Sequence, residues 1–559
     1  MSAEEILIEG RRLTGANFFC DEPAAILDVE IDPAKFDAFF VKWKKTVEAL
    51  HLRLERASPK VLFRTHKLGQ SLIVTAPIDA LYSTIELLEE VFTKLTSNNN
   101  TSLTTETLHT LSTKYKAIYK EEERRDIRKL QDEALARNTP FLWDDDFLSL
   151  GYGKHSATWA LDQLPSDPDW KSYKSMPLAI ITGTNGKSTT TRLCSQILKK
   201  ANLTVGFSST DGIWAGEKCL DSGDYSGPGG AREVLRNKSV DAAILEVARG
   251  GLLRRGLGAE NADISLITNV AEDHLGEYGV NTLDELIEAK FIIRKALKPG
   301  GSLILNADDA GCVKFAESLD ETIVWFSLNK KNPIIQHQLE NGLTTYYANA
   351  GSLVVSRDGT ESDIGEINNI PICFQGAAKH NISNALAASA LCSQLGINDK
   401  AIKAGLISFD GNEQNPGRGN IFTHQGASIM VDFAHNPHGL NAVVDTLLQL
   451  PAKRRLVMFG HAGDRSNEDI HSLTKAALRL KPDQVIVYEM KDYLRGRKLG
   501  EIPTIINESL VSLDFPLDQV MQAHDPVDGT KKALEWSEDG DFLLLLALAD
   551  RDAVFNLLK

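Results

Sequence analysis

The chain has 559 residues, more than one hydrophobic core normally organises, so about two to four domains are expected. Its composition, 42% hydrophobic and 25% charged, is that of a globular protein and gives no sign of bulk disorder. The formal net charge of −15 repels polyanions, which excludes a general affinity for nucleic acid or an anionic membrane surface.

The cysteines and the apolar runs indicate the cellular compartment of the protein. The cysteines lie far apart and form no C-x-x-C motif, which favours reduced thiols in the cytoplasm. No basic stretch followed by an apolar core opens the chain, and the longest apolar run, 542–549, is about a third of a membrane span. We expect a cytoplasmic protein without a membrane anchor. The oligomeric state stays open, a homo-oligomer included.

Hydrophobic patterning divides the chain into four parts. Residues 1–100 alternate short apolar runs with amphipathic stretches and predict a small α+β domain, and residues 101–175 are charged and helix-prone and predict a helical connector. From residue 176, apolar runs such as LAIIT and AAILEV alternate with helical patterns, which predicts a parallel sheet covered on both faces. A second such series predicts a smaller α/β domain. The expected limits are 176–412 for the central domain and 413–559 for the C-terminal one.

The strongest motif joins the buried strand at Ile180-Ile181 to a helix through a glycine-containing turn. Glycines let backbone N–H groups approach phosphate oxygens, the helix N-terminus favours negative charge, Lys187 adds a point charge, and Ser188 can bind Mg²⁺. Ile181 stands where the standard phosphate loop has its first glycine, so this loop is a variant. The predicted nucleotide-binding residues of the loop are Gly183, Thr184, Asn185, Gly186, Lys187, Ser188 and Thr189.

Two further strand ends carry metal-ligand types. Glu246 closes one apolar strand, and His274 follows the next one in Asn-Val-Ala-Glu-Asp-His. Ligands of open α/β sheets collect at such ends, so these side chains and Ser188 are the predicted magnesium ligands. Taken alone, a glutamate or histidine at a strand end is more often structural or solvated than a ligand, and it is their order after the phosphate loop that favours the functional role.

The ordered motifs resemble the Mur ligase superfamily. They are GTNGKST, the strand-end Glu246, Asn-x-x-x-Asp-His, Ala289-Lys290, the H-N-x-x-N-A element at His380, Pro416-Gly417-Arg418 and Asp-Phe-Ala-His-Asn-Pro at 432–437. The resemblance implies an α/β fold with a central P-loop ATPase domain and a C-terminal Rossmann-like domain, preceded here by the small α+β domain. It also implies ATP and Mg²⁺ as cofactors.

The same resemblance assigns roles to individual residues. It makes Lys187, Glu246, His274, Lys290 and Arg418 the catalytic set, and it places Asn381, Asn384, Arg418 and Asp432 on the nucleotide. Lys290 stands where many Mur ligases carry a carbamylated lysine, although a lysine on a solvated helix face is the alternative. Because Arg418 and Asp432 come from the C-terminal domain, the two domains have to close before chemistry.

Segments outside the ATP-binding elements resemble the Mur-ligase half of cyanophycin synthetase. They are the Arg-Gly-Gly segment after Glu246, Gly463-Asp464-Arg465, Leu494-Arg495-Gly496-Arg497 and, near the start, Arg11-Arg12-Leu-Thr-Gly15-Ala-Asn17. The ATP-grasp domain of that family is expected to be absent. The candidate substrate-binding residues are Arg249, Arg254, His435, Asp464, Arg465, Arg495 and Arg497, with a surface ion-pair network as the alternative for the last four and a structural role as the alternative for His435.

Together these patterns predict an ATP-dependent ligase that activates a carboxylate as an acyl phosphate and couples it to an amino acid or amine. Arginine or another basic amine joined to an aspartyl carboxylate is the first candidate pair by resemblance. A cell-wall or folylpolyglutamate type of ligase with another acceptor is the alternative enzyme, and a non-catalytic ATP-binding paralogue is the alternative outside catalysis.

Overall fold

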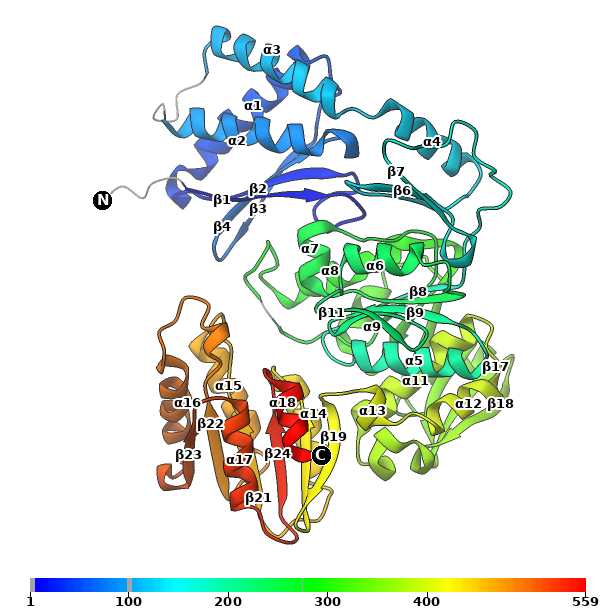
Figure 1. The fold of residues 1–559 in the computed structure, drawn as a ribbon, viewed down its shortest axis with the longest axis vertical. Coiled ribbons are helices and arrows are strands. Elements are labelled where there is room, and N and C mark those ends of the chain that lie inside the picture. The colour runs from blue at the N-terminus through cyan, green and yellow to red at the C-terminus, as the bar shows by residue number, and fades with distance from the viewer. Residues whose placement is uncertain (1–5, 98–102, 274) are drawn as a thin grey trace. The chain divides into compact units, whose positions relative to one another are not determined.

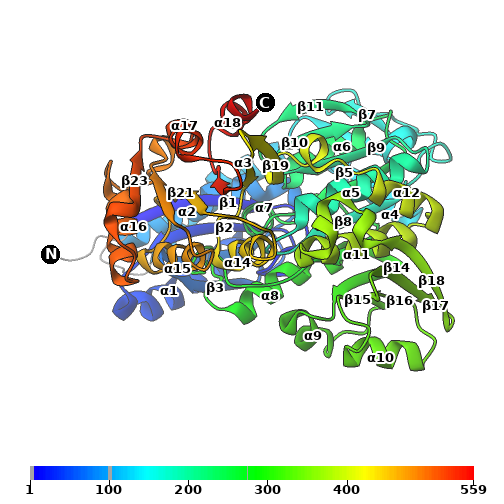
Figure 2. The ribbon, with the colours of Figure 1, turned by 90° about the horizontal axis from the view of Figure 1, so that it is seen from below.

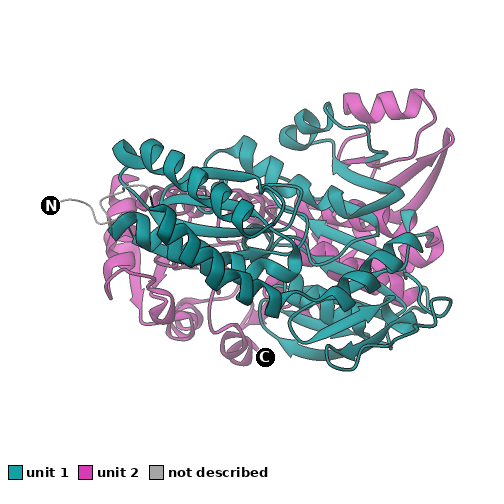
Figure 3. Cartoon of the chain, turned by 90° about the horizontal axis from the view of Figure 1, so that it is seen from above, with its two compact units in different colours: residues 1–183, 201–324, 394–396 teal, residues 184–200, 325–393, 397–559 magenta. Residues whose placement is uncertain are grey.

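The computed structural model describes residues 6–97, 103–273 and 275–559. The chain forms two compact units, shown in Figure 3. Unit 1 comprises residues 1–183, 201–324 and 394–396, and unit 2 comprises residues 184–200, 325–393 and 397–559. This division does not follow the limits expected from the sequence, which remain a proposal. His274, one of the predicted metal ligands, lies outside the described residues.

Unit 1 begins with a four-stranded antiparallel sheet in the order β1-β2-β4-β3. Three helices cover one face (Figure 1), where Trp43 is fully buried against Leu27 and Leu72. Ile26 and Ile73 are buried on the other face, so both faces of this sheet are covered. The elements are β1 (Ile6–Leu13), β2 (Ala24–Glu30), α1 (Pro33–Arg53), β3 (Val61–His66), β4 (Gly69–Thr75), η1 (Ile78–Ala80), α2 (Leu81–Ser97) and α3 (Thr105–Glu122).

Residues 101–175, for which the sequence predicted a helical connector, hold other elements as well as helices. Helix α3 belongs to the N-terminal core, because Leu111, Tyr115 and Tyr119 are buried there. The following residues also form a small antiparallel sheet, β5-β6-β7, whose strands are too short to show an alternating pattern in the sequence. The elements are α4 (Arg125–Ala136), β5 (Phe141–Trp143), β6 (Phe147–Leu150), η2 (Gly153–His155) and β7 (Ala157–Ala160). Residues 161–177 hold no helix or strand and lead directly to β8.

The main sheet of unit 1 has the order β11-β10-β9-β12-β8-β13-β14. The strands from β9 to β14 are parallel, as the alternation of apolar runs and helices predicted, and β10 and β11 add an antiparallel edge. The strands are β8 (Leu178–Thr182), β9 (Val205–Ser209), β10 (Gly212–Ala215), β11 (Lys218–Ser222), β12 (Ala242–Glu246), β13 (Ala262–Ile267) and β14 (Leu297–Asn306). The helices are α6 (Pro228–Arg236), α7 (Arg249–Arg255), α8 (Leu283–Phe291), η3 (Ile292–Ala296) and α9 (Ala310–Ala316).

Unit 2 contains the helix that follows the phosphate loop and the strands after residue 325. Helix α5 packs on α12, and the Cys194 thiol of α5 lies 3.9 Å from the Ala388 carbonyl of α11. Strand β15 pairs parallel with β16, and β16, β17 and β18 pair antiparallel. The elements are α5 (Lys187–Lys200), β15 (Ile323–Ser327), α10 (Pro333–Glu340), β16 (Thr345–Asn349), β17 (Ser352–Arg357), β18 (Thr360–Glu366), η4 (Ile367–Asn369), η5 (Pro371–Gly376), α11 (Lys379–Gln394), α12 (Asp399–Ile407) and α13 (Gly411–Gln414).

The rest of unit 2 is a second α/β sheet, in the order β19-β20-β24-β21-β22-β23, with β19 as its antiparallel edge. Helices cover both faces, α14 to α16 on one and α17 and α18 on the other (Figure 2). The expected α/β fold class is thus confirmed. The elements are β19 (Arg418–His424), β20 (Ala427–Asp432), α14 (Pro437–Leu447), β21 (Arg455–Phe459), α15 (Asn467–Leu478), β22 (Gln484–Tyr488), η6 (Lys491–Tyr493), α16 (Glu501–Ser512), η7 (Leu517–Gln519), β23 (Val520–Ala523), α17 (Pro526–Trp536), β24 (Phe542–Leu546) and α18 (Arg551–Leu558).

All six cysteines are free, and four of them are buried: Cys194, Cys312, Cys373 and Cys392. Among the described helices, none combines the length and the apolar character needed to cross a membrane.

Candidate functional site

The phosphate loop has the backbone that the sequence predicted. Strand β8 is buried along its whole length, and the chain then turns through Gly183 and Gly186, which have φ angles of +151° and +86°. L side chains rarely adopt such angles. A Cβ atom on Gly186 would also lie 2.2 Å from Oδ1 of Asn384 on α11. Glycine is therefore required at position 186 both for the turn and for the approach of α11.

Asn384 reaches the loop because Asn381 holds it. The Asn384 side-chain amide donates to Oδ1 of Asn381 at 3.1 Å, and the Asn381 amide donates to the Ile372 carbonyl at 2.8 Å. Both side chains are buried on one face of α11, as their spacing of three predicted. The structure thus brings Asn384 to the loop and gives Asn381 a supporting role.

Asn185 joins the loop to the start of α14. The Asn436 side chain donates to Oδ1 of Asn185 at 3.2 Å, and the Asn185 amide lies 2.8 Å from Nδ1 of His438. Asn436 also caps α14 by accepting the Gly439 N–H at 2.8 Å. Lys187 begins α5, with its ammonium 3.0 Å from the Thr184 carbonyl. The predicted loop residues 184–189 and the Asn-Pro element therefore lie together in unit 2.

Arg418 and Asp432 face each other across the β19–β20 ladder. Burial raises the pKa of Asp432 to about 6, and the nearby Arg418 guanidinium acts in the opposite direction. The Arg418 guanidinium also lies 5.6 Å from the centre of the Phe433 ring. Phe433, Tyr493 and residues 547–553 line a hollow of about 520 Å³ at this end of the sheet. A basic, an acidic and an aromatic side chain thus gather beside a space open to a ligand.

In unit 1, Glu246 ends β12 opposite Ile181 of β8, the strand that leads into the phosphate loop. Its side chain is buried, with the residue 1% exposed. Lys290 on α8 is 4% exposed, which contradicts the alternative of a lysine on a solvated helix face. A buried carboxylate and a buried lysine are the groups expected at a phosphoryl-transfer site, and their catalytic roles stay a prediction.

The two candidate arginines of α7 differ. Arg249, at the first position of the helix, forms an ion pair of 2.6 Å with Glu277 and has 10% of its side chain exposed. Arg254 is exposed on the same helix, so Arg249 is the better placed candidate for a substrate.

The candidate residues of the C-terminal sheet form a network of their own. Arg495 pairs with Asp464. Arg497 donates to the Gly463 carbonyl at 3.0 Å and the Arg465 carbonyl at 2.6 Å, and it pairs with Glu501 at 2.9 Å. Arg497 thus holds the 463–465 loop in place. These contacts agree with the alternative interpretation, a surface ion-pair network. His435 lies close to its own strand end, with Nδ1 3.1 Å from the Phe433 carbonyl.

His461 is a residue that the motifs missed. It is 4% exposed, just beyond β21, and burial lowers its pKa to about 4, with Arg465 acting in the same direction and His435 nearby. The imidazole is therefore neutral at pH 7. Its position directly after an apolar strand, in Phe-Gly-His, was the available signal.

The comparisons with known proteins agree with this architecture. The Mur ligase middle domain matches residues 181–392, and the Mur ligase glutamate ligase domain matches residues 417–547, more than half of the chain together. The chain belongs to the Mur ligase superfamily.

Individual proteins similar to this chain show how far the similarity extends. Cyanophycin synthetase from Geminocystis herdmanii is 38% identical over 339 residues, which cover 60% of this chain and 38% of that protein. The chain therefore spans well under half the length of this Mur-ligase relative. UDP-N-acetylmuramoyl-L-alanyl-D-glutamate–2,6-diaminopimelate ligase from Listeria monocytogenes is 24% identical over 68% of the chain and 74% of that protein. The fold also resembles folylpolyglutamate synthase from Mycobacterium tuberculosis, with a TM-score of 0.50, 17% identity, and 68% of this chain and 91% of that one covered.

The donor groups suit magnesium better than a transition metal. Within the described part of the chain, no three histidine, cysteine, aspartate or glutamate side chains gather as a dedicated metal site. Magnesium does not need such a cage, because it keeps waters and takes one or two protein oxygens besides the phosphates of a nucleotide. The hydroxyl of Ser188 in unit 2 and the buried carboxylate of Glu246 in unit 1 are each an oxygen donor of this kind.

Proposed function

We propose that the protein is an ATP-dependent amide-bond ligase that activates a substrate carboxylate as an acyl phosphate and couples it to an amine. The observation that carries this proposal is the phosphate loop, in which Gly186 lies against Asn384 and Asn185 contacts Asn436, within a chain of the Mur ligase superfamily. Such a loop binds phosphates, and membership of a ligase superfamily indicates that the bound phosphates take part in ligation.

The first step is phosphoryl transfer, which depends on position and charge. Lys187 and the backbone N–H groups of residues 184–189 hold the β- and γ-phosphates of ATP. A carboxylate oxygen of the substrate attacks the γ-phosphorus, the bond to the β-phosphate oxygen breaks, and ADP leaves. Bound magnesium, for which Ser188 and Glu246 are each a candidate ligand, would neutralise phosphate charge. Arg418 adds a cation at the phosphates, and Asp432 accepts hydrogen bonds from the ribose hydroxyls.

The second step forms the amide. The nitrogen of a neutral amine attacks the acyl carbon, the tetrahedral intermediate expels inorganic phosphate, and the departing phosphate takes the proton that the nitrogen loses. The negative oxygen of that intermediate needs nearby cations in a site from which water is excluded. The largely buried Arg249 is the cation that we assign to it.

For the substrates, we infer a basic amino acid, with arginine first, and an aspartyl carboxylate. The support is the 38% identity to cyanophycin synthetase. A small diacid or a glutamyl acceptor is the alternative that the same experiment distinguishes.

The test measures phosphate release from ATP and Mg²⁺ with a panel of acidic peptides and amino acids, followed by mass spectrometry of the products. We expect release that requires both a carboxylate and an amine, with a product whose mass equals the sum of the two minus water. Lys187→Ala should abolish product, whereas Lys200→Ala, at the exposed end of the same helix, should not. No release with any pair would favour a non-catalytic nucleotide-binding protein, and continued ligation by Lys187→Ala would exclude this phosphate site.

A further inference from the structure

Arg11, on β1 of the N-terminal sheet, is buried, with 2% of its side chain exposed. Its guanidinium forms two parallel bonds to Asp28, at 2.6 and 2.9 Å. The remaining nitrogen, Nη1, donates to the Leu253 carbonyl of α7 at 2.7 Å. Asp28 also accepts a hydrogen bond from the Ser71 hydroxyl at 2.5 Å, so the carboxylate is held from a second strand. Arg11 thus links the N-terminal sheet to the helix that carries Arg249.

The Arg11 guanidinium also contacts the segment 276–281, which connects elements of the central sheet. Its carbon lies 5.0 Å from the centre of the Tyr278 ring and 5.7 Å from that of Phe19, within the range of a cation–π interaction. Tyr278 follows Glu277, the partner of Arg249. Both ends of the Arg249–Glu277 pair therefore lie on segments that Arg11 contacts.

Backbone contacts repeat this connection just after Arg11 in the chain. The Thr14 N–H donates to the Arg255 carbonyl at 3.2 Å, and the Leu257 N–H donates to the Ala16 carbonyl at 2.9 Å. Between them Gly15 lies so close to α7 that a Cβ atom would be 2.1 Å from the Leu257 carbonyl oxygen. Residues 14–16, which belong to the segment that resembles the start of cyanophycin synthetase, thus form a docking segment for the end of α7.

The β3–β4 hairpin holds the other segment. The Lys67 N–H donates to the Gly276 carbonyl at 3.0 Å, and the Asn281 side chain donates to the Thr65 carbonyl at 2.9 Å. Arg64 pairs with Glu285 at 3.0 Å, at the start of the helix that carries Lys290. The N-terminal sheet therefore contacts α7, the 276–281 segment and α8.

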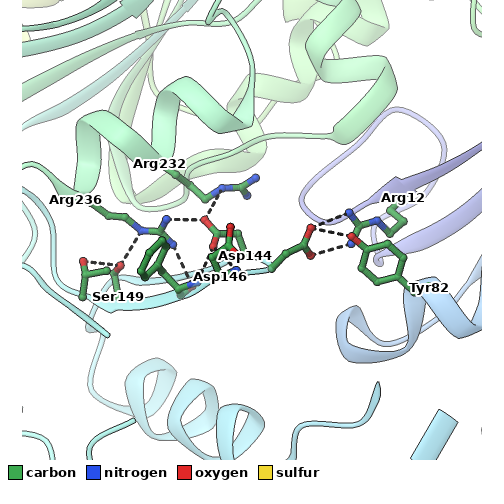
Figure 4. Close-up of polar contacts among 10 residues, drawn as sticks. Arg12, Tyr82, Asp144, Asp146, Ser149, Arg232 and Arg236 are labelled. Atoms are coloured by element: carbon green, nitrogen blue, oxygen red, sulfur yellow. Dashed lines mark hydrogen bonds and ion pairs between the residues drawn. The ribbon is translucent and has the colours of Figure 1, made fainter. Parts of the chain in front are cut away.

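The turn between β5 and β6 makes a further link (Figure 4). Asp144 accepts from Arg236 at 2.5 Å and lies 3.5 Å from Arg232, both on α6. Its neighbour Asp145 accepts from Arg12 at 3.1 and 3.2 Å and from the Tyr82 hydroxyl. These contacts are more exposed than those of Arg11, with 18% of the Arg12 side chain and 59% of the Asp145 side chain accessible. Exposed ion pairs contribute little, so Arg12 provides the control for Arg11.

We propose that Arg11 is a positioning residue, which fixes α7 and the 276–281 segment so that the Arg249–Glu277 pair is presented to the substrate carboxylate. The proposal rests on the proposed ligase function and deepens it, because it gives the N-terminal domain a part in substrate binding. Lysine cannot replace arginine here, since an ammonium cannot bond both oxygens of Asp28 and the Leu253 carbonyl and stack on Tyr278 in one geometry.

The first experiment needs no substrate. Hydrogen exchange of the full-length chain is measured for wild type, Arg11→Lys and Arg12→Gln. For Arg11→Lys we expect exchange at residues 249–257 and 276–281 to be about tenfold faster, with the core strand β12 unchanged; Arg12→Gln should match wild type. Tyr278→Leu, which leaves the Asp28 pair intact, is the second variant should Arg11→Lys fold poorly, and it should loosen the 276–281 segment. Unchanged exchange in both variants overturns the proposal.

The second experiment uses ligation with the carboxylate found in the screen. Arg11→Lys should raise the KM for the carboxylate about tenfold while the KM for ATP changes less than twofold, and the double variant Arg11→Lys with Arg249→Ala should be no worse than Arg249→Ala alone. An equal loss in every kinetic parameter would mean a merely structural role. If no ligation occurs at all, the proposed function fails, and the exchange result still decides whether Arg11 holds these segments.

Discussion

At Gly186 the requirement for glycine has two separable causes, the left-handed backbone and the contact with Asn384. We expect Gly186→Ala to weaken ATP binding at least about tenfold, because a methyl group must displace the Asn384 amide or reshape the loop. Gly396→Ala is the matched control, since Gly396 has a φ of +84° but nothing within 4 Å of a Cβ atom. Calorimetric titration with ATP measures both. An ATP affinity of Gly186→Ala no weaker than that of Gly396→Ala would contradict the prediction.

Asp432 predicts a dependence on pH. Because burial raises its pKa to about 6, the carboxylate becomes protonated as pH falls through that value and can no longer accept two hydrogen bonds from the ribose. We expect ATP affinity to fall between pH 7.5 and 5, and to be weak and nearly independent of pH in Asp432→Asn. Nucleotide titrations at several pH values test this. A wild-type profile that is flat across pH 6 would remove Asp432 from the site.

The same shift fixes the sign of a stability effect. A carboxyl whose pKa is higher in the folded chain than its ordinary 3.8 binds its proton more tightly when folded, so its charged form costs stability above about pH 6. At pH 8, Asp432→Asn without nucleotide should therefore be more stable than wild type by about 1 to 3 kcal/mol, and this difference should vanish toward pH 4. Denaturant unfolding at the two pH values measures it.

At the scale of elements, the start of α14 combines a helix cap with a contact to the phosphate loop. Asn436→Ala should lower the free energy of unfolding by about 1 kcal/mol through the lost cap and should raise the KM for ATP about fivefold through the lost Asn185 contact. Asn398→Ala removes a cap of the same kind from α12, where Asn398 accepts the Ala401 N–H at 2.9 Å. We expect the two variants to lose similar amounts of stability, and we expect the KM for ATP to change in Asn436→Ala only. A changed KM in both would trace the effect to stability.

Elements with a strong local signal were predictable from the sequence. Strand β8 and its loop were, because a run of apolar residues followed by glycine, lysine and serine leaves few alternatives. The two α/β series were also predicted, since buried parallel strands are apolar throughout. The three-residue strand β5 and the membership of α3 in the N-terminal core were not, because they depend on contacts with distant residues such as Tyr119 with Trp43 in one core. His461 was missed for the same reason, as its burial depends on the packing beyond β21.

At the scale of the whole molecule, unit 1 joins the N-terminal residues to the central sheet by contacts that no local pattern records. Arg11 bonds a carbonyl 242 residues away, and Arg236 bonds Asp144 92 residues away. The N-terminal segment shows a resemblance in sequence, but its role could not be predicted, because such pairs follow no spacing rule. Their number suggests that the N-terminal sheet, the β5–β7 sheet and the central sheet unfold together.

This cooperativity can be tested by truncation. A chain that begins at residue 161 loses the docking segment 14–16, Arg11, Asp144 and Asp145. The residues around Leu253 and Leu257 and the side chains of α6 then lose these contacts. We expect its remaining central domain to melt at least about 5 °C lower, since each kcal/mol corresponds to a few degrees in a domain of this size. Thermal unfolding followed by hydrogen exchange at β12 and at residues 249–257 measures this. In the full-length chain those peptides and β2 should lose protection at the same temperature; an earlier loss at β2, with the truncated chain as stable as the full one, would show an independent N-terminal domain.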